Sequence, residues 1–198
     1  MSNPNIISPS AAGRKLHATE EIAGFAVRPG LFLVNGATIV PGGISFTIHS
    51  IGATSCELCL FHRTEQQPYA VLPFPDRFRI GNTWSMIVFG LDITQFEYAY
   101  RMDGPYDPER GLLFDKTRFL LDPYARAVTG QSLWGERPSA DTAYHARVVE
   151  DVFDWGDYND THIPFQDMVI YELHVRGFTQ HPSSGVEHPG TFAGLMEK

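Results

Sequence analysis

The segment Ile44-Ser45-Phe46-Thr47-Ile48 alternates apolar and small polar side chains. Alternation with a period of two is typical of a β-strand with one buried face. Runs of similar character recur at spacings of roughly 8–12 residues, and no amphipathic helix separates them. These further runs are 31–34, 56–61, 69–72, 84–89 and 96–102. The pattern predicts a mainly β protein built around an immunoglobulin-like β-sandwich.

Length and charge narrow the class of protein. The 198 residues exceed a single β-domain of about 100 residues and fall short of an α/β barrel of about 250, which indicates one whole unit joined to part of another. The 15 Lys and Arg against 23 Asp and Glu give a net charge of −8, which argues against nucleic-acid and anionic-membrane partners. No run approaches the roughly 18 apolar residues of a membrane span. Because residues 1–5 also lack the character of a secretory signal, we expect a cytoplasmic location.

Cys56 and Cys59 form a Cys-Glu-Leu-Cys string, a spacing compatible with a redox or metal pair. The stretch around them is strand-like, and residues three apart on a strand point to opposite faces. The sequence has no second cysteine pair for a zinc site, and no helix signal follows Cys59 directly. We therefore expect two structural cysteines and no metal site.

The composition and pattern of the sequence change after Tyr106. Residues 107–155 contain many Pro and Gly steps and several aromatic residues, and we interpret them as an ordered, irregular connector. A β-rich run, Met168–Val175, follows, and Thr191 is a candidate N-cap for a helix that starts at Phe192. A lone strand needs partners for its apolar face. The residues alone leave two alternatives for 168–175, an edge strand of the sandwich or the first strand of a different unit.

Several strings resemble, in the same order, the start of bacterial glycogen-debranching enzymes. One is Tyr98–Tyr106, which is similar to Tyr-x-Tyr-Arg-x-x-Gly-Pro, and another is Leu120–Ala125, which matches Leu-Leu-Asp-Pro-Tyr-Ala. The others are 36–38, 43–46, 57–61, 169–179 (similar to Val-Ile-Tyr-Glu-x-His-Val-Arg-Gly-Phe-Thr) and 190–195 (similar to Gly-Thr-Phe-x-Gly-Leu). The chain thus resembles the isoamylase and pullulanase branch of glycoside hydrolase family 13.

This resemblance implies a fold and a division of the chain. Members of the branch carry a β-sandwich similar to carbohydrate-binding module family 48, followed by a (β/α)₈ catalytic barrel. The expected parts are a flexible leader, the sandwich, a connector, and the first strand and helix start of an incomplete barrel, at 1–20, 21–125, 126–165 and 166–198. No cofactor is implied.

The catalytic carboxylates of the family are expected to be missing. A retaining glycosidase places a nucleophile and an acid of raised pKa roughly 5–5.5 Å apart. The motifs that carry them, Asp-x-x-x-Asn-His and Gly-x-Arg-x-Asp, do not occur in this sequence. Asp151, Asp154, Asp157 and Asp160 recur every three residues, but the glycine and closing glutamate of a calcium loop are absent. We interpret them as an acidic connector and expect the chain by itself to be inactive.

The remaining candidate residues are a charged set and two tryptophans. In a barrel strand Glu172, His174 and Arg176 would share the face toward the lumen, and we interpret His174 as part of a structural network rather than a catalyst. Trp84 and Trp134 are candidates to stack on glucose. A core role is favoured for Trp84 because it lies in a strand-like run, whereas Trp134 is compatible with exposure or with packing.

Three functions remain open on the sequence. The first is the N-terminal part of an enzyme that hydrolyses α-1,6 branches of glycogen, starch or limit dextrin. The second is a stand-alone α-glucan-binding module, which the barrel-like string at 169–179 disfavours. The third is the front half of a branching or trehalose-forming enzyme, which the strings at 103–106 and 120–125 disfavour. An unpaired strand at 168–176 also predicts self-association.

Overall fold

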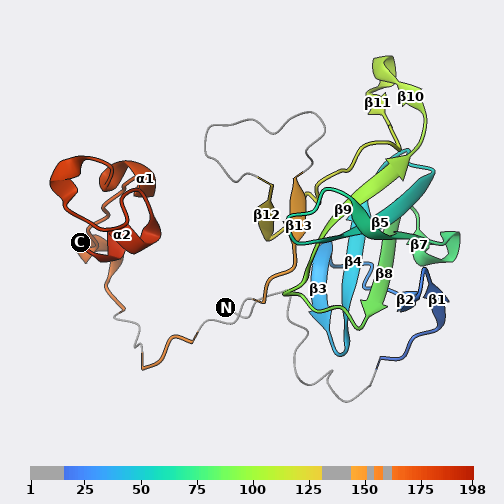
Figure 1. Cartoon of the computed structure of the whole chain (residues 1–198), viewed down its shortest axis with the longest axis horizontal. Coiled ribbons are helices and arrows are strands. Elements are labelled where there is room, and N and C mark those ends of the chain that lie inside the picture. Colours follow the sequence, from blue (N-terminus) through green and yellow to red (C-terminus); the bar gives the residue numbers. More distant parts are fainter. Residues whose placement is uncertain (1–15, 131–143, 151–153, 158–161) are drawn as a thin grey trace. The chain divides into compact units, whose positions relative to one another are not determined.

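The computed structural model describes residues 16–130, 144–150, 154–157 and 162–198. The chain forms two compact units, Met1–Val152 and Phe153–Lys198. All strands of the described residues belong to the first unit (Figure 1). No helix within the described ranges has the length and apolar character needed to cross a membrane.

The first unit is a sandwich of two antiparallel sheets that face each other (Figure 1). Sheet A contains, in spatial order, β1 (Glu20–Ile22), β2 (Phe25–Pro29), β8 (Thr83–Phe89), β4 (Gly43–His49) and β3 (Gly36–Val40), with β7 (Arg79–Ile80) also on β8. Sheet B contains β12 (Ala127–Thr129), β13 (His145–Arg147), β9 (Phe96–Asp103), β5 (Ser55–His62) and β6 (Pro68–Pro73). A hairpin of β10 (Tyr106–Asp107) and β11 (Leu112–Leu113) follows β9. The mainly β, immunoglobulin-like sandwich predicted from the sequence is confirmed.

Aromatic side chains from both sheets fill the space between them. Phe46 of β4 packs edge-on against Tyr98 of β9, with ring centroids 5.1 Å apart at 71°. Both residues are fully buried. Burying one such side chain contributes roughly 1.5–3 kcal/mol, so this cross-sheet contact is a main source of the sandwich's stability.

The strand-like runs at 44–48, 56–61, 69–72, 84–89 and 96–102 lie within strands of the structure. The strand expected at 31–34 is wrong, because these residues form a turn in which Val34 N–H donates to the Leu31 carbonyl at 3.1 Å. Two side chains of sheet A form hydrogen bonds with the backbone of this turn. Leu31 N–H donates to Ser45 Oγ at 2.9 Å, and Thr47 Oγ1 donates to the Leu31 carbonyl at 3.1 Å. The segment therefore lies on a sheet face and does not extend a sheet.

This turn buries the polar side of β4. Ser45 and Thr47 have no exposed surface, although their alternation with apolar residues predicts a solvated face. Thr47 Oγ1 also lies 2.6 Å from Ser85 Oγ. Gly30 permits the close approach, because a Cβ there would lie 2.7 Å from Met86 N. Both faces of β4 are consequently dry, and its hydroxyl groups are hydrogen-bonded instead of solvated.

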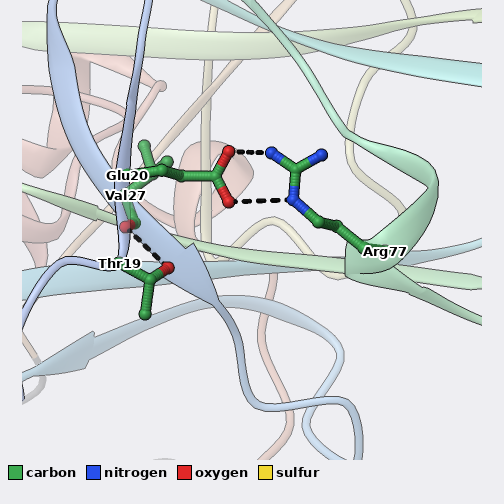
Figure 2. Close-up of polar contacts among 4 residues, drawn as sticks. All are labelled: Thr19, Glu20, Val27 and Arg77. Atoms are coloured by element: carbon green, nitrogen blue, oxygen red, sulfur yellow. Dashed lines mark hydrogen bonds and ion pairs between the residues drawn. The ribbon is translucent and has the colours of Figure 1, made fainter.

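A surface ion pair joins β1 to the short 3-10 helix at Asp76–Phe78. The Arg77 guanidinium faces the Glu20 carboxylate with two parallel contacts, of which Nε to Oε1 is 3.0 Å (Figure 2). Beside it, Thr19 Oγ1 donates to the Val27 carbonyl at 3.4 Å (Figure 2). Within residues 16–130, strand pairing begins at Glu20, the last residue of the expected leader.

Sheet B also contains two short strands that the sequence pattern did not reveal. Both β12 and β13, which follow residue 125, belong to sheet B, and the domain bounds expected from the sequence remain a prediction. Each has three residues, which is too short for a period of two to stand out from the surrounding irregular sequence. The first unit ends at Val152.

The second unit is built around two short helices, α1 (Val175–Phe178) and α2 (Phe192–Met196). Thr191 caps α2 as predicted, because its Oγ1 accepts a hydrogen bond from Gly194 N–H at 3.0 Å. The buried Thr179 accepts a bond from Gly190 N–H at 2.7 Å. Local caps and loop bonds thus provide much of the order in this unit.

The expected strand at 168–176 does not form in this structure. Residues 168–174 have no strand assignment, α1 begins at Val175, and neither sheet includes the segment. A barrel strand forms backbone hydrogen bonds with strands on both sides. Within the described residues, no strand lies beside the segment 168–176 to form such bonds. Val169 and Ile170, which an alternating strand would point to opposite faces, are 93% and 76% exposed.

Candidate functional site

The structure separates the two tryptophan candidates. Trp84 is 1% exposed and belongs to the sandwich core. Its ring is therefore not available to stack on a sugar, and Trp84 is no longer a candidate for glucan binding. The guanidinium of Arg79 covers the ring, with Cζ 4.3 Å from the ring centroid. Trp134 lies outside the described residues.

The charged candidates of the second unit do not share one strand face. Glu172 is exposed, and His174 is the N-cap of α1, where its Nδ1 accepts a bond from Gly177 N–H at 3.1 Å. Arg176 lies within α1 and is half-buried. Since the segment is not a strand here, a role for the three side chains in a barrel lumen remains a prediction.

Two strings that carry the family resemblance bond directly to each other. Tyr98 Oη donates to Asp122 Oδ2 at 2.8 Å, and Asp122 Oδ1 accepts from Tyr124 N–H at 2.8 Å. Leu120 and Tyr100 exchange two backbone hydrogen bonds of 2.7 and 2.9 Å. Burial raises the pKa of Asp122, while the bonds from Tyr124 and Tyr98 oppose that rise. These residues close the edge of β9, and their role in the structure is architectural.

The glycines of the same strings also serve close packing. Gly36 has φ +84°, and a Cβ there would lie 2.9 Å from Tyr124 Cβ. At Gly104 a Cβ would lie 2.6 Å from the Phe114 ring and 3.0 Å from the Gly52 carbonyl oxygen. A side chain at either position would displace the facing loop.

The outer face of sheet B is covered by the chain itself. Phe61 stacks on His145 with centroids 3.8 Å apart, and Phe119 packs edge-on against Phe61 at 5.0 Å. His145 Nδ1 lies 3.2 Å from Glu97 Oε2, and the two side chains are 1% and 6% exposed. This buried pair joins β13 to β9, and the face around it is closed to a ligand.

Two hollows on the described part of the first unit differ in their lining. One, of about 360 Å³, is lined largely by apolar side chains such as Met102, Leu112 and Phe114. The other, of about 640 Å³, is lined by polar groups that include Asp76 and Asn82. A sugar-binding site combines a flat exposed ring with hydrogen-bonding groups. The first hollow suits an apolar group rather than a sugar. Beside the second hollow, the Trp84 ring is covered by Arg79 and cannot stack on a sugar.

The cysteines take the structural role expected of them. Cys56 lies in the sandwich core and Cys59 in the cluster on the outer face of sheet B, as a spacing of three on a strand predicts. Burial raises the pKa of both thiols, that of Cys59 to about 12, so both are protonated and unreactive at neutral pH. Within the described ranges, no three His, Cys, Asp or Glu side chains gather in a way that could hold a metal.

Comparison with known families identifies the sandwich. Residues 35–125 match the model of carbohydrate-binding module 48, the isoamylase N-terminal domain. The chain is 34% identical to chloroplastic isoamylase 1 of Arabidopsis thaliana over 97% of its own length and 27% of that protein. It is 40% identical to the glycogen debranching enzyme of Serratia proteamaculans, over 84% of this chain and 26% of that enzyme.

Solved structures agree with this. A pullulanase from Paenibacillus barengoltzii superposes with a TM-score of 0.62 at 27% identity, covering 83% of this chain and 22% of the pullulanase. The same enzyme in complex with maltohexaose and α-cyclodextrin also gives 0.62, at 25% identity.

The sandwich is therefore a carbohydrate-binding module of family 48. The chain as a whole belongs to the family of the isoamylases, pullulanases and glycogen debranching enzymes that it matches. It spans about a quarter of the length of the curated relatives that it matches.

Proposed function

We propose that this chain works as the front region of an enzyme that hydrolyses α-1,6-glucosidic branches in glycogen, starch or limit dextrins. The observation that carries the proposal is the extent of the similarity. The Arabidopsis isoamylase aligns with 97% of the chain, so the likeness continues past the sandwich and through the second unit. A module that acted alone would have no need of that continuation.

The chain does not itself carry the motifs of the catalytic carboxylates. Rate accelerations of about 10⁶-fold and more depend on that positioned pair. We therefore expect the purified chain to release no reducing ends from pullulan or glycogen above a control without protein. Release above that control would contradict this part of the proposal.

The sandwich is proposed to contact α-glucan. Support comes from the name of its family and from the Paenibacillus pullulanase that was crystallised with maltohexaose and α-cyclodextrin. A second candidate function, a stand-alone glucan-binding module, is favoured by one observation. The sandwich has a continuous core of its own, which includes Phe46, Leu58 and Tyr98.

A chimera distinguishes the two functions. The matching region of the Serratia debranching enzyme is replaced by this chain, and α-1,6 hydrolysis of β-limit dextrin is measured. We expect activity within about tenfold of the unmodified enzyme, a difference of about 1.4 kcal/mol in activation free energy, whereas deletion of the region should abolish it. A folded chimera that binds glycogen but does not hydrolyse branches would favour the stand-alone module.

A cytoplasmic location goes with this proposal. The free thiols of Cys56 and Cys59 are compatible with a reducing compartment, and bacterial debranching enzymes are among the relatives. Chloroplastic isoamylases are also among them. Fractionation of cells that produce the protein should recover it with cytoplasmic markers, and recovery with an organelle or periplasm would contradict the assignment.

A further inference from the structure

An exposed pair of stacked rings lies where β5 ends and β6 begins. The rings of His62 and Tyr69 have centroids 4.3 Å apart at 20°. Tyr69 is 40% exposed, and His62 is also exposed. Stacking holds the Tyr69 ring in one orientation, which lowers the entropy that it would lose on binding a flat ligand.

A β-bulge produces this arrangement. Leu60 of β5 pairs with Ala70 of β6, whereas the next residue, Phe61, pairs with Pro68. Tyr69 is thereby left as the extra residue of β6. Bulges redirect a side chain and are common next to functional sites.

Hydrogen-bonding groups lie at the same end of sheet B. His62 is paired with Phe96, the first residue of β9, so the preceding loop, residues 90–95, is adjacent. In this loop Asp92 Oδ1 accepts bonds from both the N–H and the Oγ1 of Thr94, at 2.8 and 2.7 Å. The side chains of Asp92, Thr94 and Gln95 are exposed.

Electrostatics keep this loop charged. The hydrogen bonds from Thr94, together with the positive charge of Arg63, hold the pKa of Asp92 below its usual range. Arg63 directly follows His62 and is exposed. The end of sheet B that carries the ring pair therefore also carries a guanidinium, a carboxylate, a hydroxyl and an amide. Flat apolar faces and vicinal hydroxyl groups are the two features that a glucose residue presents.

We propose that His62 and Tyr69, flanked by Arg63 and the 90–95 loop, form a binding subsite for an α-1,4-linked glucan chain. The proposal rests on the proposed contact of the sandwich with α-glucan and names the residues that make it. The other exposed tyrosines in the described part of the chain lack this arrangement. Tyr106 is 71% exposed, but the ring contacts of the described residues give it no stacked partner.

The test measures maltoheptaose binding to the whole 198-residue chain by isothermal titration calorimetry. Tyr69→Ala should weaken binding about tenfold, the effect of roughly 1.4 kcal/mol from a stacked ring, while Tyr69→Phe should keep the wild-type affinity. Arg63→Met should weaken binding about threefold, as expected for one hydrogen bond. Tyr106→Ala is the matched control and should have no effect.

The outcomes separate this subsite from the proposed function. If the wild-type chain binds maltoheptaose and Tyr69→Ala binds equally well, the subsite assignment is overturned and the glucan contact of the sandwich stands. If Tyr106→Ala loses affinity instead, the site lies elsewhere on the sandwich. If the wild-type chain gives no binding heat and no retardation in a glycogen-containing gel, both the subsite and the glucan contact are overturned. Thermal unfolding of each variant shows that its fold is retained.

Discussion

The two units of the chain differ in where their large apolar side chains lie. In the sandwich, Phe46 and Leu58 have no exposed surface. In the second unit, Phe165, Val169 and Met196 are 85%, 93% and 88% exposed. The β-rich residues of the first unit have neighbouring strands to pair with, whereas those at 168–171 have none among the described residues.

The comparison shows which signals are local. The N-cap at Thr191 forms as the sequence predicts, because a cap needs only residues within three positions of itself. A strand needs residues far away in the chain, as when β5 pairs with β9. A correct strand pattern is therefore not sufficient for a strand.

The largest expected difference between the units comes from a core deletion. Trp84→Ala should lower the free energy of unfolding of the sandwich by about 3–5 kcal/mol, because it removes a fully buried ring and leaves a cavity. Phe192 is 74% exposed in the second unit. Phe192→Ala should therefore change the free energy of unfolding by less than about 0.5 kcal/mol. Urea unfolding followed by fluorescence checks both, and equal effects would show that the units are not energetically distinct.

A smaller effect is expected at Asp122. Asp122→Ala should cost about 1–3 kcal/mol, because it leaves the buried Tyr98 hydroxyl without its acceptor. Burial raises the folded-state pKa of Asp122 above its unfolded value, so the native state binds this proton more tightly. The contribution of the group to stability therefore falls as pH rises from the unfolded pKa, about 3.9, to the raised folded pKa. In Asp122→Asn this decline should be absent, and a difference from wild type that does not vary with pH would contradict the assignment.

Self-association should depend on the exposed segment at 168–176. The wild-type chain is expected to associate at roughly tens of micromolar, the range in which unpaired apolar strands aggregate. Val169→Lys should restore a monomer in sedimentation velocity, because a charge in the segment makes intermolecular pairing costly. Met196→Lys alters an equally exposed apolar residue of α2 and is the control. A monomeric wild type, or equal rescue by the two variants, would exclude association through this segment.

The smallest expected effect is at the cysteines. Because burial raises the pKa of both thiols, neither Cys56 nor Cys59 should react with a disulfide reagent in the native protein. Both should react after unfolding in guanidinium. Rapid reaction of the native protein would show that sheet B opens far more often than its buried face indicates.

Sequence periodicity located the long strands, but it did not predict which segments pack on their outer faces. The turn at 31–34 was predicted as a strand because its residues are apolar, yet Leu33 is 99% exposed. The pair of Glu97 and His145 could not be predicted, since 48 residues separate its members. No periodicity marks their contact.

The candidate sugar-binding residues show the same limit. Trp84 was chosen by residue type, and its burial follows from the packing of β8 against sheet B. Tyr69 was placed correctly on a strand and was not recognised as a site. Its orientation depends on the bulge at Leu60 and Phe61, which no residue in that stretch specifies. Pro68 is the one local hint, because a proline in a sheet is confined to edge strands, strand starts and bulges.

The way β13 is attached has a mechanical consequence. In the described residues it pairs with β9 at a single position, Ala146 opposite Tyr98, and the His145–Glu97 contact lies beside that pair. The chain leaves β13 toward the second unit. Tension along the chain would load these few bonds in succession, because so short a strand cannot share the force among many parallel bonds. The long pairing of β5 with β9 would remain intact, so release of β13 would lengthen the connection before the centre of sheet B is disrupted.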